Sequence, residues 1–256
     1  MPFKVLSWNV QRLSPLSERR PGVERVIERN KPDLLFLSEI SHDLVVPGYI
    51  EIGHALSLNK SKVMGKGAGT HGQLNTKLYM REDSTLEIHG VKTIRQGAGQ
   101  PRLMLRAVVE DAGRTHTLDF IHSKATKKGG VAAMKKAKAS AIKFKNHSVF
   151  GDFNHDISIK DHLAEAAAGG AKVVPVLDTA GKVAAETHKS SKSSASFDYA
   201  LTGEDVEMEA LRPRVDTRAV PKVDARLGVK TGYKLRRVPP RFVTLSDHRP
   251  AFVRIK

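Results

Sequence analysis

Alternating and continuous apolar segments predict a protein built mainly of β-strands. Residues 3–10 alternate apolar and polar side chains, which is typical of a strand with one buried face. Residues 33–40 form a nearly continuous apolar run, as expected of a strand buried on both faces. Further strand-like segments are found at 74–81, 85–94, 103–110, 115–122, 148–154 and 250–255. The pattern therefore places strands in both halves of the chain.

Three segments have the apolar spacing of helices that cover such strands. The first begins near Ser17, a residue suited to cap a helix, and is interrupted by Pro32. The second spans 129–145, with Phe144 among its inward-facing residues and a lysine-rich face outward. The third spans 158–168. Strands separated by helices in this way predict an α/β fold of two stacked sheets flanked by helices.

Length and composition are those of one globular domain. A chain of 256 residues with 40% hydrophobic residues can bury one large core, so we expect residues 1–256 to form a single domain and a monomer. No apolar run approaches the roughly 20 residues of a membrane-spanning helix. The first residues lead into a strand without the features of a secretory signal peptide, so a cytoplasmic location is expected. Delivery by another route, as an effector or toxin, is compatible with this. The absence of cysteine excludes disulfides, thiolate metal ligands and a cysteine nucleophile.

A large excess of basic residues points to a polyanionic partner. Lysine and arginine number 43 against 27 acidic residues, which gives a formal net charge of +16. Basic side chains placed against phosphates release condensed counterions, so nucleic acid is the natural partner. An inert basic surface and attraction to anionic lipid remain alternatives, and charge does not distinguish DNA from RNA. Three segments, 58–72, 179–195 and 216–241, are predicted to be basic surface loops.

Five short polar strings stand out, and four of them lie at one end of a predicted strand. They are Trp8-Asn9-Val10-Gln11, Leu37-Ser38-Glu39-Ile40, Gly151-Asp152-Phe153-Asn154, Ser196-Phe197-Asp198-Tyr199-Ala200-Leu201 and Ser246-Asp247-His248-Arg249-Pro250. Together they supply carboxylate, amide and imidazole groups, from which a metal site for phosphate chemistry can be assembled. Any one string alone is also compatible with an ordinary junction between a strand and a turn. The five strings in this order are far more specific.

In these strings and their order, the chain resembles the endonuclease/exonuclease/phosphatase superfamily, whose best-known member is deoxyribonuclease I. The resemblance extends from residue 3 to residue 255. It implies a four-layer α/β/β/α sandwich and Mg²⁺-dependent hydrolysis of phosphate esters, with Mn²⁺ as a substitute. Residues 8–11, 122–130 and 197–203 also resemble the catalytic subunit of cytolethal distending toxins. That likeness bears on the chemistry and not on the biological role.

The resemblance assigns metal-binding and water-activating roles to acidic residues. Glu39 and Asp247 match the metal ligands of the superfamily. Asp152 would orient or deprotonate the attacking water, or bind metal, while Asn154 would donate to a phosphoryl oxygen. The strand period of two also predicts that Asp152 and Asn154 share one face. Glu39 at the end of an apolar strand would be costly without a partner or a metal.

Two histidines match catalytic positions of the superfamily. His248 is assigned to the scissile phosphate, with Asp198 as the carboxylate that fixes its tautomer and favours its charged form. His122 matches a second histidine, which deoxyribonuclease I pairs with a glutamate on the strand aligned with residues 74–81. No acidic residue occurs between positions 63 and 80 of this chain. His122 therefore either has another partner or differs in its proton chemistry.

Polar residues near these strings are candidate substrate contacts. Asn9 matches a carboxamide that contacts the metal site or the phosphate, and Gln11, two residues further along the strand, is expected near the same site. Arg102 resembles an arginine that binds a DNA phosphate in deoxyribonuclease-like members. Asn75 is a further candidate, although the segment that it begins is also typical of a simple strand opening.

The combined pattern predicts a Mg²⁺-dependent endonuclease that cleaves DNA with little sequence preference. A phosphatase or phosphodiesterase acting on inositol phosphates or phospholipids would use the same catalytic groups. A nucleic-acid-binding protein without catalytic activity is the third possibility. The acidic set disfavours it, because an acidic cluster without metal would repel phosphate.

Overall fold

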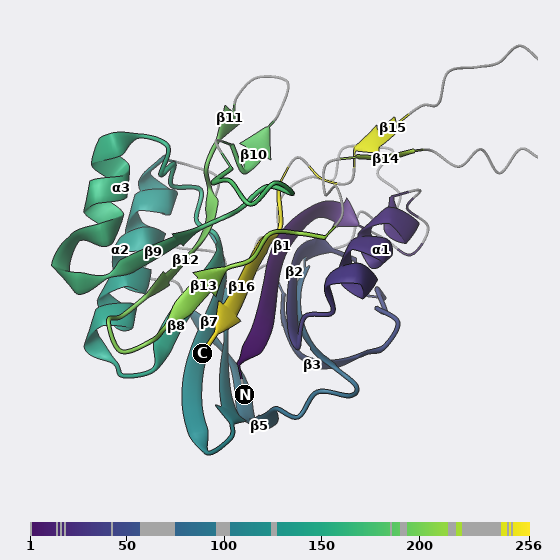
Figure 1. The fold of residues 1–256 in the computed structure, drawn as a ribbon, viewed down its shortest axis with the longest axis horizontal. Coiled ribbons are helices and arrows are strands. Elements are labelled where there is room, and N and C mark those ends of the chain that lie inside the picture. The colour runs from purple at the N-terminus through teal and green to yellow at the C-terminus, as the bar shows by residue number, and fades with distance from the viewer. Residues whose placement is uncertain are drawn as a thin grey trace, which may run out of the picture.

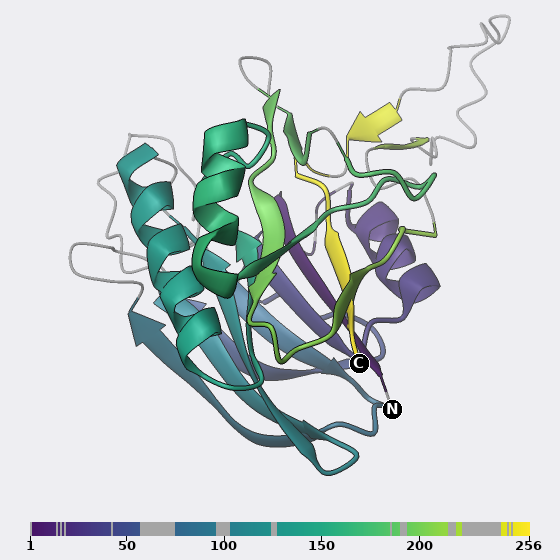
Figure 2. The same ribbon diagram turned by 60° about the vertical axis from the view of Figure 1, so that its left-hand side comes forward.

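Two mixed sheets of six strands each form the centre of the molecule, and helices cover both outer faces (Figures 1 and 2). The computed structural model describes residues 2–13, 15, 17, 19–41, 43–56, 75–95, 103–123, 127–184, 186–189, 194–214, 219–221, 242–244, 246 and 248–256. The layers follow the order helix, sheet, sheet, helix, which confirms the predicted α/β/β/α sandwich. None of the described helices combines the length and apolar character needed to cross a membrane.

The first sheet has the strand order β13-β16-β1-β2-β4-β3. Its strands are β1 (Phe3–Leu13), β2 (Leu34–Ile40), β3 (Tyr49–Leu56), β4 (Asn75–Arg81), β13 (Met208–Ala210) and β16 (Ala251–Ile255). β1 lies between β2, with which it is parallel, and β16, with which it is antiparallel. Helix α1 (Arg20–Asn30) packs its apolar face on this sheet, where Val26 joins a buried cluster with Trp8 and Leu35.

The second sheet has the strand order β5-β6-β7-β8-β12-β9. Its strands are β5 (Glu87–Arg95), β6 (Leu103–Asp111), β7 (Arg114–His122), β8 (His147–Asp152), β9 (Lys172–Pro175) and β12 (Asp198–Thr202). β8 is parallel to β7 and antiparallel to β12. Helices α2 (Lys127–Lys143) and α3 (Lys160–Ala167) cover its outer face, and the short 3-10 helix η1 (Ala168–Gly170) follows α3. Met134 of α2 packs there in one cluster with Phe153 and Tyr199.

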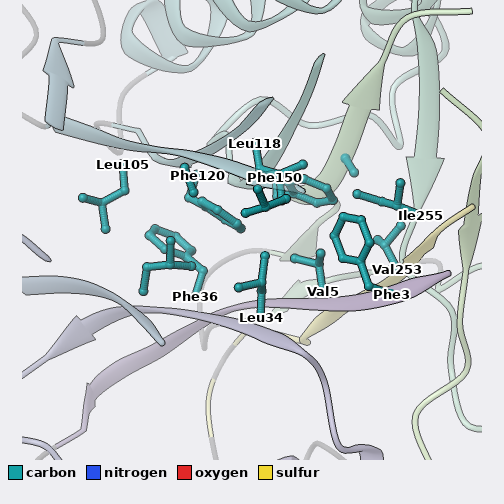
Figure 3. Close-up of a cluster of buried hydrophobic side chains, with 14 of the residues drawn as sticks. Phe3, Val5, Leu34, Phe36, Leu105, Leu118, Phe120, Phe150, Val253 and Ile255 are labelled. Atoms are coloured by element: carbon teal, nitrogen blue, oxygen red, sulfur yellow. The ribbon is translucent and has the colours of Figure 1, made fainter. Parts of the chain in front are cut away.

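An apolar layer between the sheets fixes which face of each strand points inward (Figure 3). Phe36 of the first sheet stacks on Phe120 of the second with ring centroids 5.1 Å apart, and Phe120 lies 5.5 Å from Phe150. Because side chains alternate between the faces of a strand, residues two positions beyond these phenylalanines also face the other sheet. This rule brings His122 and Asp152 to the same end of the inter-sheet layer.

Several elements differ from the sequence-based prediction. β3, β9, β12 and β13 were not among the predicted strands. Phe144 was expected to point inward but is 48% exposed, because α2 ends one residue before it. The predicted loop 179–195 contains two very short strands, β10 (His188–Lys189) and β11 (Ser194–Ala195), which pair with each other. Similarly, β14 (Ala219–Pro221) lies within the predicted loop 216–241 and pairs with β15 (Phe242–Thr244). The predicted loop 58–72 lies outside the described residues.

Candidate active site

Residues at the ends of strands from both sheets meet at one end of the inter-sheet layer. Asn9 is on the inward face of β1, because it follows Phe3 and Val5 at the strand period of two. On the second sheet, strand register sets Asp152 of β8 directly beside His122 of β7 on one side and Asp198 of β12 on the other. All four of these residues, Asn9, His122, Asp152 and Asp198, were predicted site residues, and all are buried.

Asp152 lies at the centre of this group. Its Oδ2 accepts a hydrogen bond from Asn9 Nδ2 at 3.2 Å, which connects the two sheets. The same oxygen lies 3.8 Å from Nε2 of His122 and 3.8 Å from Nε2 of His248. Its other oxygen accepts from the backbone N–H of Asn154 at 2.9 Å. One buried carboxylate is therefore flanked by two imidazoles.

His248 is held in a defined orientation next to Asp198. Its Nδ1 lies 2.8 Å from Asp198 Oδ2, which leaves Nε2 as the outer nitrogen. Trp8 Nε1 donates to the backbone oxygen of His248 at 2.9 Å. Ser246 Oγ accepts from the His248 N–H at 3.0 Å and donates to the Asn9 carbonyl at 2.6 Å. Burial raises the pKa of Asp198 to about 6, although the contact with His248 acts in the opposite direction.

His122 also has a carboxylate neighbour on the other sheet, and it is closer than Asp152. Nε2 of His122 lies 3.3 Å from Oε1 of Glu39, at the end of β2 in the first sheet. The Glu39 side chain is 18% exposed, so it connects the buried group to the surface. Nε2 of His122 thus faces two carboxylates, Glu39 and Asp152, although β4 itself carries no acidic residue.

Three predicted site residues have a positive φ, a backbone conformation that is uncommon for residues other than glycine. The φ angles are 47° at Gln11, 58° at Glu39 and 48° at Asn154. Side chains support two of these turns: Asn9 Oδ1 accepts from the N–H of Gln11 at 3.1 Å, and Asp152 supports Asn154 as described. Such conformations cost of order 1–3 kcal/mol each and concentrate at functional sites.

These turns change two details of the prediction. The pairing of β1 with β2 shifts register after Asn9, so strand alternation does not continue to Gln11, whose side chain is exposed while that of Asn9 is buried. β8 ends at Asp152, so Asn154 lies in the following turn and not on a strand face. Its Nδ2 donates to the Ser123 carbonyl at 3.2 Å, which leaves the second N–H of the amide available.

Helix α2 packs directly against the Asn154 turn. A Cβ atom added to Gly130, in the first turn of α2, would lie 2.1 Å from the Asn154 carbonyl oxygen. Only glycine permits this approach without moving the backbone that carries the candidate site.

Gly130→Ala is therefore expected to lower the free energy of unfolding by about 1–3 kcal/mol. Replacing glycine by alanine within a helix normally raises the free energy of unfolding by about 1 kcal/mol, so a decrease would be opposite to the usual effect. Urea denaturation measures it, with Gly90→Ala as the control, because a Cβ at the exposed Gly90 has no neighbour within 4 Å. Equal stabilities of the two variants would contradict the proposed contact.

The remaining candidates are placed less centrally or not at all. Asn75, the first residue of β4, is buried beside Ile40, and its Oδ1 accepts no hydrogen bond from the described part of the chain. Arg102 and Asp247 lie outside the described residues. Asp247 stays a predicted metal ligand, as it directly precedes His248 in the sequence.

The donor set of the site fits a hard divalent cation. Within the described residues, Asp152, Asp198 and His248 place potential ligand atoms within 4.8 Å of one another, and so do the more exposed Glu87, His89 and Glu110. In the first of these groups, two buried carboxylates lie next to each other, with amide and imidazole groups around them. Buried carboxylates need a compensating positive charge, and Mg²⁺ prefers such oxygen donors.

Two further residues of this region were not predicted from the sequence. Thr187 bonds to the start of β12, and the ring of His188 lies with its centroid 4.7 Å from that of His248. They occur in a segment rich in Lys, Ser, Thr and Ala, which reads as a surface loop. No local pattern distinguishes them, because their importance depends on contacts with residues distant in sequence.

Comparison with known proteins identifies the fold. No protein-family model matches the chain, and no match was found among curated proteins. The catalytic domain of human Nocturnin, with a bound sulfate anion, matches with a TM-score of 0.67 and 17% identity, covering 100% of this chain and 94% of that chain. An endonuclease/exonuclease/phosphatase family protein from Bacteroides thetaiotaomicron matches with a TM-score of 0.64 and 15% identity, covering 100% and 97%. A mannosyl-6-phosphatase from Bacteroides thetaiotaomicron VPI-5482 matches with a TM-score of 0.62 and 17% identity, covering 99% of each chain. The chain therefore has the endonuclease/exonuclease/phosphatase fold, as the five strings predict.

Proposed function

We propose that the chain is a divalent-metal-dependent hydrolase of phosphate esters, and specifically an endonuclease that cleaves DNA with little sequence preference. The arrangement around Asp152 carries this proposal. Asp152 lies between two histidines, and each histidine is next to a second carboxylate: Glu39 beside His122 and Asp198 beside His248. Phosphodiester hydrolysis needs a base for water, an acid for the leaving oxygen and stabilisation of the phosphoryl charge, and this arrangement provides a group for each.

Each side chain has a role in this mechanism. Asp152 accepts a proton from the attacking water. Asp198 holds Nδ1 of His248, so that Nε2–H of the imidazolium donates to a phosphoryl oxygen. His122, next to Glu39, protonates the leaving oxygen. Glu39 and Asp247 would hold Mg²⁺, or Mn²⁺ in its place, and the bound ion would supply positive charge to the phosphoryl oxygens.

Polar residues around these groups would bind the substrate. Asn154 would donate its remaining amide hydrogen to a phosphoryl oxygen, and Asn9 would keep Asp152 in place through the 3.2 Å hydrogen bond. Gln11 and Arg102 would contact the nucleic acid further out.

Nucleic acid is favoured as the substrate because the chain carries a net charge of +16. Part of this charge lies on one described surface, where α2 and the residues after it expose Lys135, Lys136, Lys143 and Lys145. A small anionic substrate would need only a local basic pocket, whereas a polyanion benefits from charge spread over a surface.

The test is incubation of supercoiled plasmid with purified protein and Mg²⁺. Nicked and linear products are expected, because the site contains the groups for phosphodiester hydrolysis. Chelation by EDTA should abolish cleavage, and so should His248→Ala, while DNA binding by the variant persists and weakens steeply with salt. Cleavage that continues in excess EDTA would contradict the role of a divalent metal.

If folded, DNA-binding protein leaves the plasmid intact in the presence of Mg²⁺, a different phosphate ester becomes the proposed substrate. The fold is shared with a mannosyl-6-phosphatase, so inositol phosphates, sugar phosphates and phospholipid vesicles are the next substrates to assay. Release of phosphate or headgroup from these would identify a phosphatase or phosphodiesterase. A protein that binds DNA and cleaves none of these substrates would be a binding protein on the same scaffold.

A further inference from the structure

Thr187 joins three segments that form the Asp198 side of the site. Its hydroxyl oxygen accepts hydrogen bonds from the backbone N–H of Phe197 at 2.8 Å and of Asp198 at 2.9 Å. Its own N–H donates to the Ala195 carbonyl at 2.9 Å, and its carbonyl accepts from the N–H of Arg249 at 2.6 Å. The side chain is almost completely buried, at 2% exposure. Thr187 therefore connects the loop before β10 with the start of β12 and with the segment that carries His248.

The hydroxyl hydrogen of Thr187 has an acceptor in the same place. A threonine hydroxyl that accepts two hydrogen bonds still has its own hydrogen to donate. The Asp198 carboxylate is that acceptor: burial raises the pKa of Asp198, and a hydrogen bond from Thr187 lowers it in part. The Asp198 carboxylate is therefore held by two donors, Thr187 and Nδ1 of His248.

The residue after Thr187 packs on the histidine of the pair. His188 and His248 form an isolated antiparallel β-bridge through their backbones. Their ring centroids are 4.7 Å apart, and the His188 ring also lies 5.2 Å from that of Phe197. Residues 187 and 188 thus contact both members of the Asp198–His248 pair, the first through a hydrogen bond and the second through ring packing.

We propose that Thr187 is a positioning residue that fixes the Asp198 carboxylate in the orientation required to hold the His248 imidazole. The role rests on the proposed function, in which His248 acts on the phosphate. Without the hydroxyl, two backbone N–H groups and the carboxylate each lose a partner, and the carboxylate becomes free to rotate away from Nδ1. Small displacements of this kind are costly, because a catalytic group must be held within about 0.5 Å of its productive position.

The test compares steady-state kinetics of Thr187→Val and Thr187→Ser. Valine keeps the shape of threonine without the hydroxyl, and we expect kcat to fall about 10- to 100-fold, as for other residues that orient a catalytic histidine. KM should stay within about twofold, because Thr187 does not touch the substrate. Serine restores the hydroxyl and should restore most of kcat.

Thr202→Val is the matched control for the loss of a buried threonine hydroxyl. Thr202 lies at the other end of β12, is fully buried, and bonds to Ser148 Oγ at 3.1 Å and to the His147 carbonyl at 3.4 Å. Its removal should lower stability and leave kcat of the folded protein unchanged. Equal kcat values for Thr187→Val and Thr202→Val would overturn the proposal. If Thr187→Val does not fold, Thr187→Ala, which leaves room for a water at the hydroxyl position, enters the same comparison.

A spectroscopic measurement separates this proposal from the proposed function. The Nδ1 proton of His248 is observable by NMR and is assigned by its absence in His248→Ala. We expect its resonance to shift or broaden in Thr187→Val and to persist in Thr187→Ser and Thr202→Val. An unchanged resonance in Thr187→Val would refute the positioning role even if the protein is a nuclease. A wild-type protein without activity toward phosphate esters would refute the function, and the resonance would still decide the role of Thr187.

Discussion

Asp152→Asn should lower kcat for phosphodiester hydrolysis by roughly 10³- to 10⁴-fold and leave the fold intact, an effect comparable to loss of a triad aspartate in other hydrolases. Asp152 accepts from Asn9 and Asn154 while its Oδ2 faces both His122 and His248. An amide of the same shape replaces one of these oxygens by an NH₂ group. The asparagine side chain can no longer accept hydrogen bonds through both of its terminal atoms, and it cannot take a proton from water.

The loss of activity is measured by single-turnover cleavage of plasmid, with circular dichroism to verify folding. Asp205→Asn is the control, because the exposed Asp205 accepts from the N–H of Asn146, which precedes β8 at the end opposite Asp152. This variant should cleave like the wild type. Retention of more than a tenth of the activity in Asp152→Asn would remove Asp152 from the chemistry and favour a purely structural role.

The positions of single strand ends could be predicted from the sequence because they depend on local periodicity. Alternation along residues 3–10 and the apolar run at 33–40 locate strands correctly, and each strand carries a polar site residue near its end, Asn9 in the first and Glu39 in the second. The resemblance to a known fold adds which strand ends meet, both for the five strings and for the strand that ends at His122. This was sufficient to bring together Asn9, His122 and Asp152, since strand period and register then fix their side chains.

Contacts that depend on irregular backbone could not be predicted in this way. Glu39 lies beside His122 because its own backbone has a positive φ, at the point where β2 shifts register against β4. Strand periodicity does not describe such a bulge. Thr187 was missed because its hydrogen bonds join the start of β12 to the segment at Arg249, which is distant in sequence. β3 was missed because it is an edge strand with Ile50 and Glu51 exposed, so its apolar pattern is weak.

A second large effect is expected away from the site, at the fully buried Asp119 of β7. Its carboxylate accepts from Nε and Nη2 of Arg106, both at 2.7 Å, and lies 2.9 Å from Nε2 of the buried His147. Burial alone would raise the pKa of Asp119, but the hydrogen bonds from Arg106 and His147 outweigh it, and the pKa lies below its usual value. Removal of one partner from a buried ion pair typically costs about 3–5 kcal/mol, and we expect Asp119→Asn to lower the free energy of unfolding by this amount.

The pH dependence of this loss distinguishes the ion pair from a simple packing defect. Because the pKa of Asp119 is lower in the folded state, the unfolded state takes up a proton first as pH falls. The stabilisation by the Asp119 carboxylate is therefore complete above the usual aspartate pKa and is lost at lower pH. The difference between wild type and Asp119→Asn in urea denaturation should therefore be largest near neutral pH and shrink in acid. Glu209→Gln is the control, because Glu209 forms only partly exposed ion pairs, with Arg254 at 3.4 Å and with Lys256 at 3.6 Å, for which the expected loss is about 1 kcal/mol or less. A difference for Asp119→Asn that is independent of pH would mean that altered packing, and not the carboxylate charge, causes the loss.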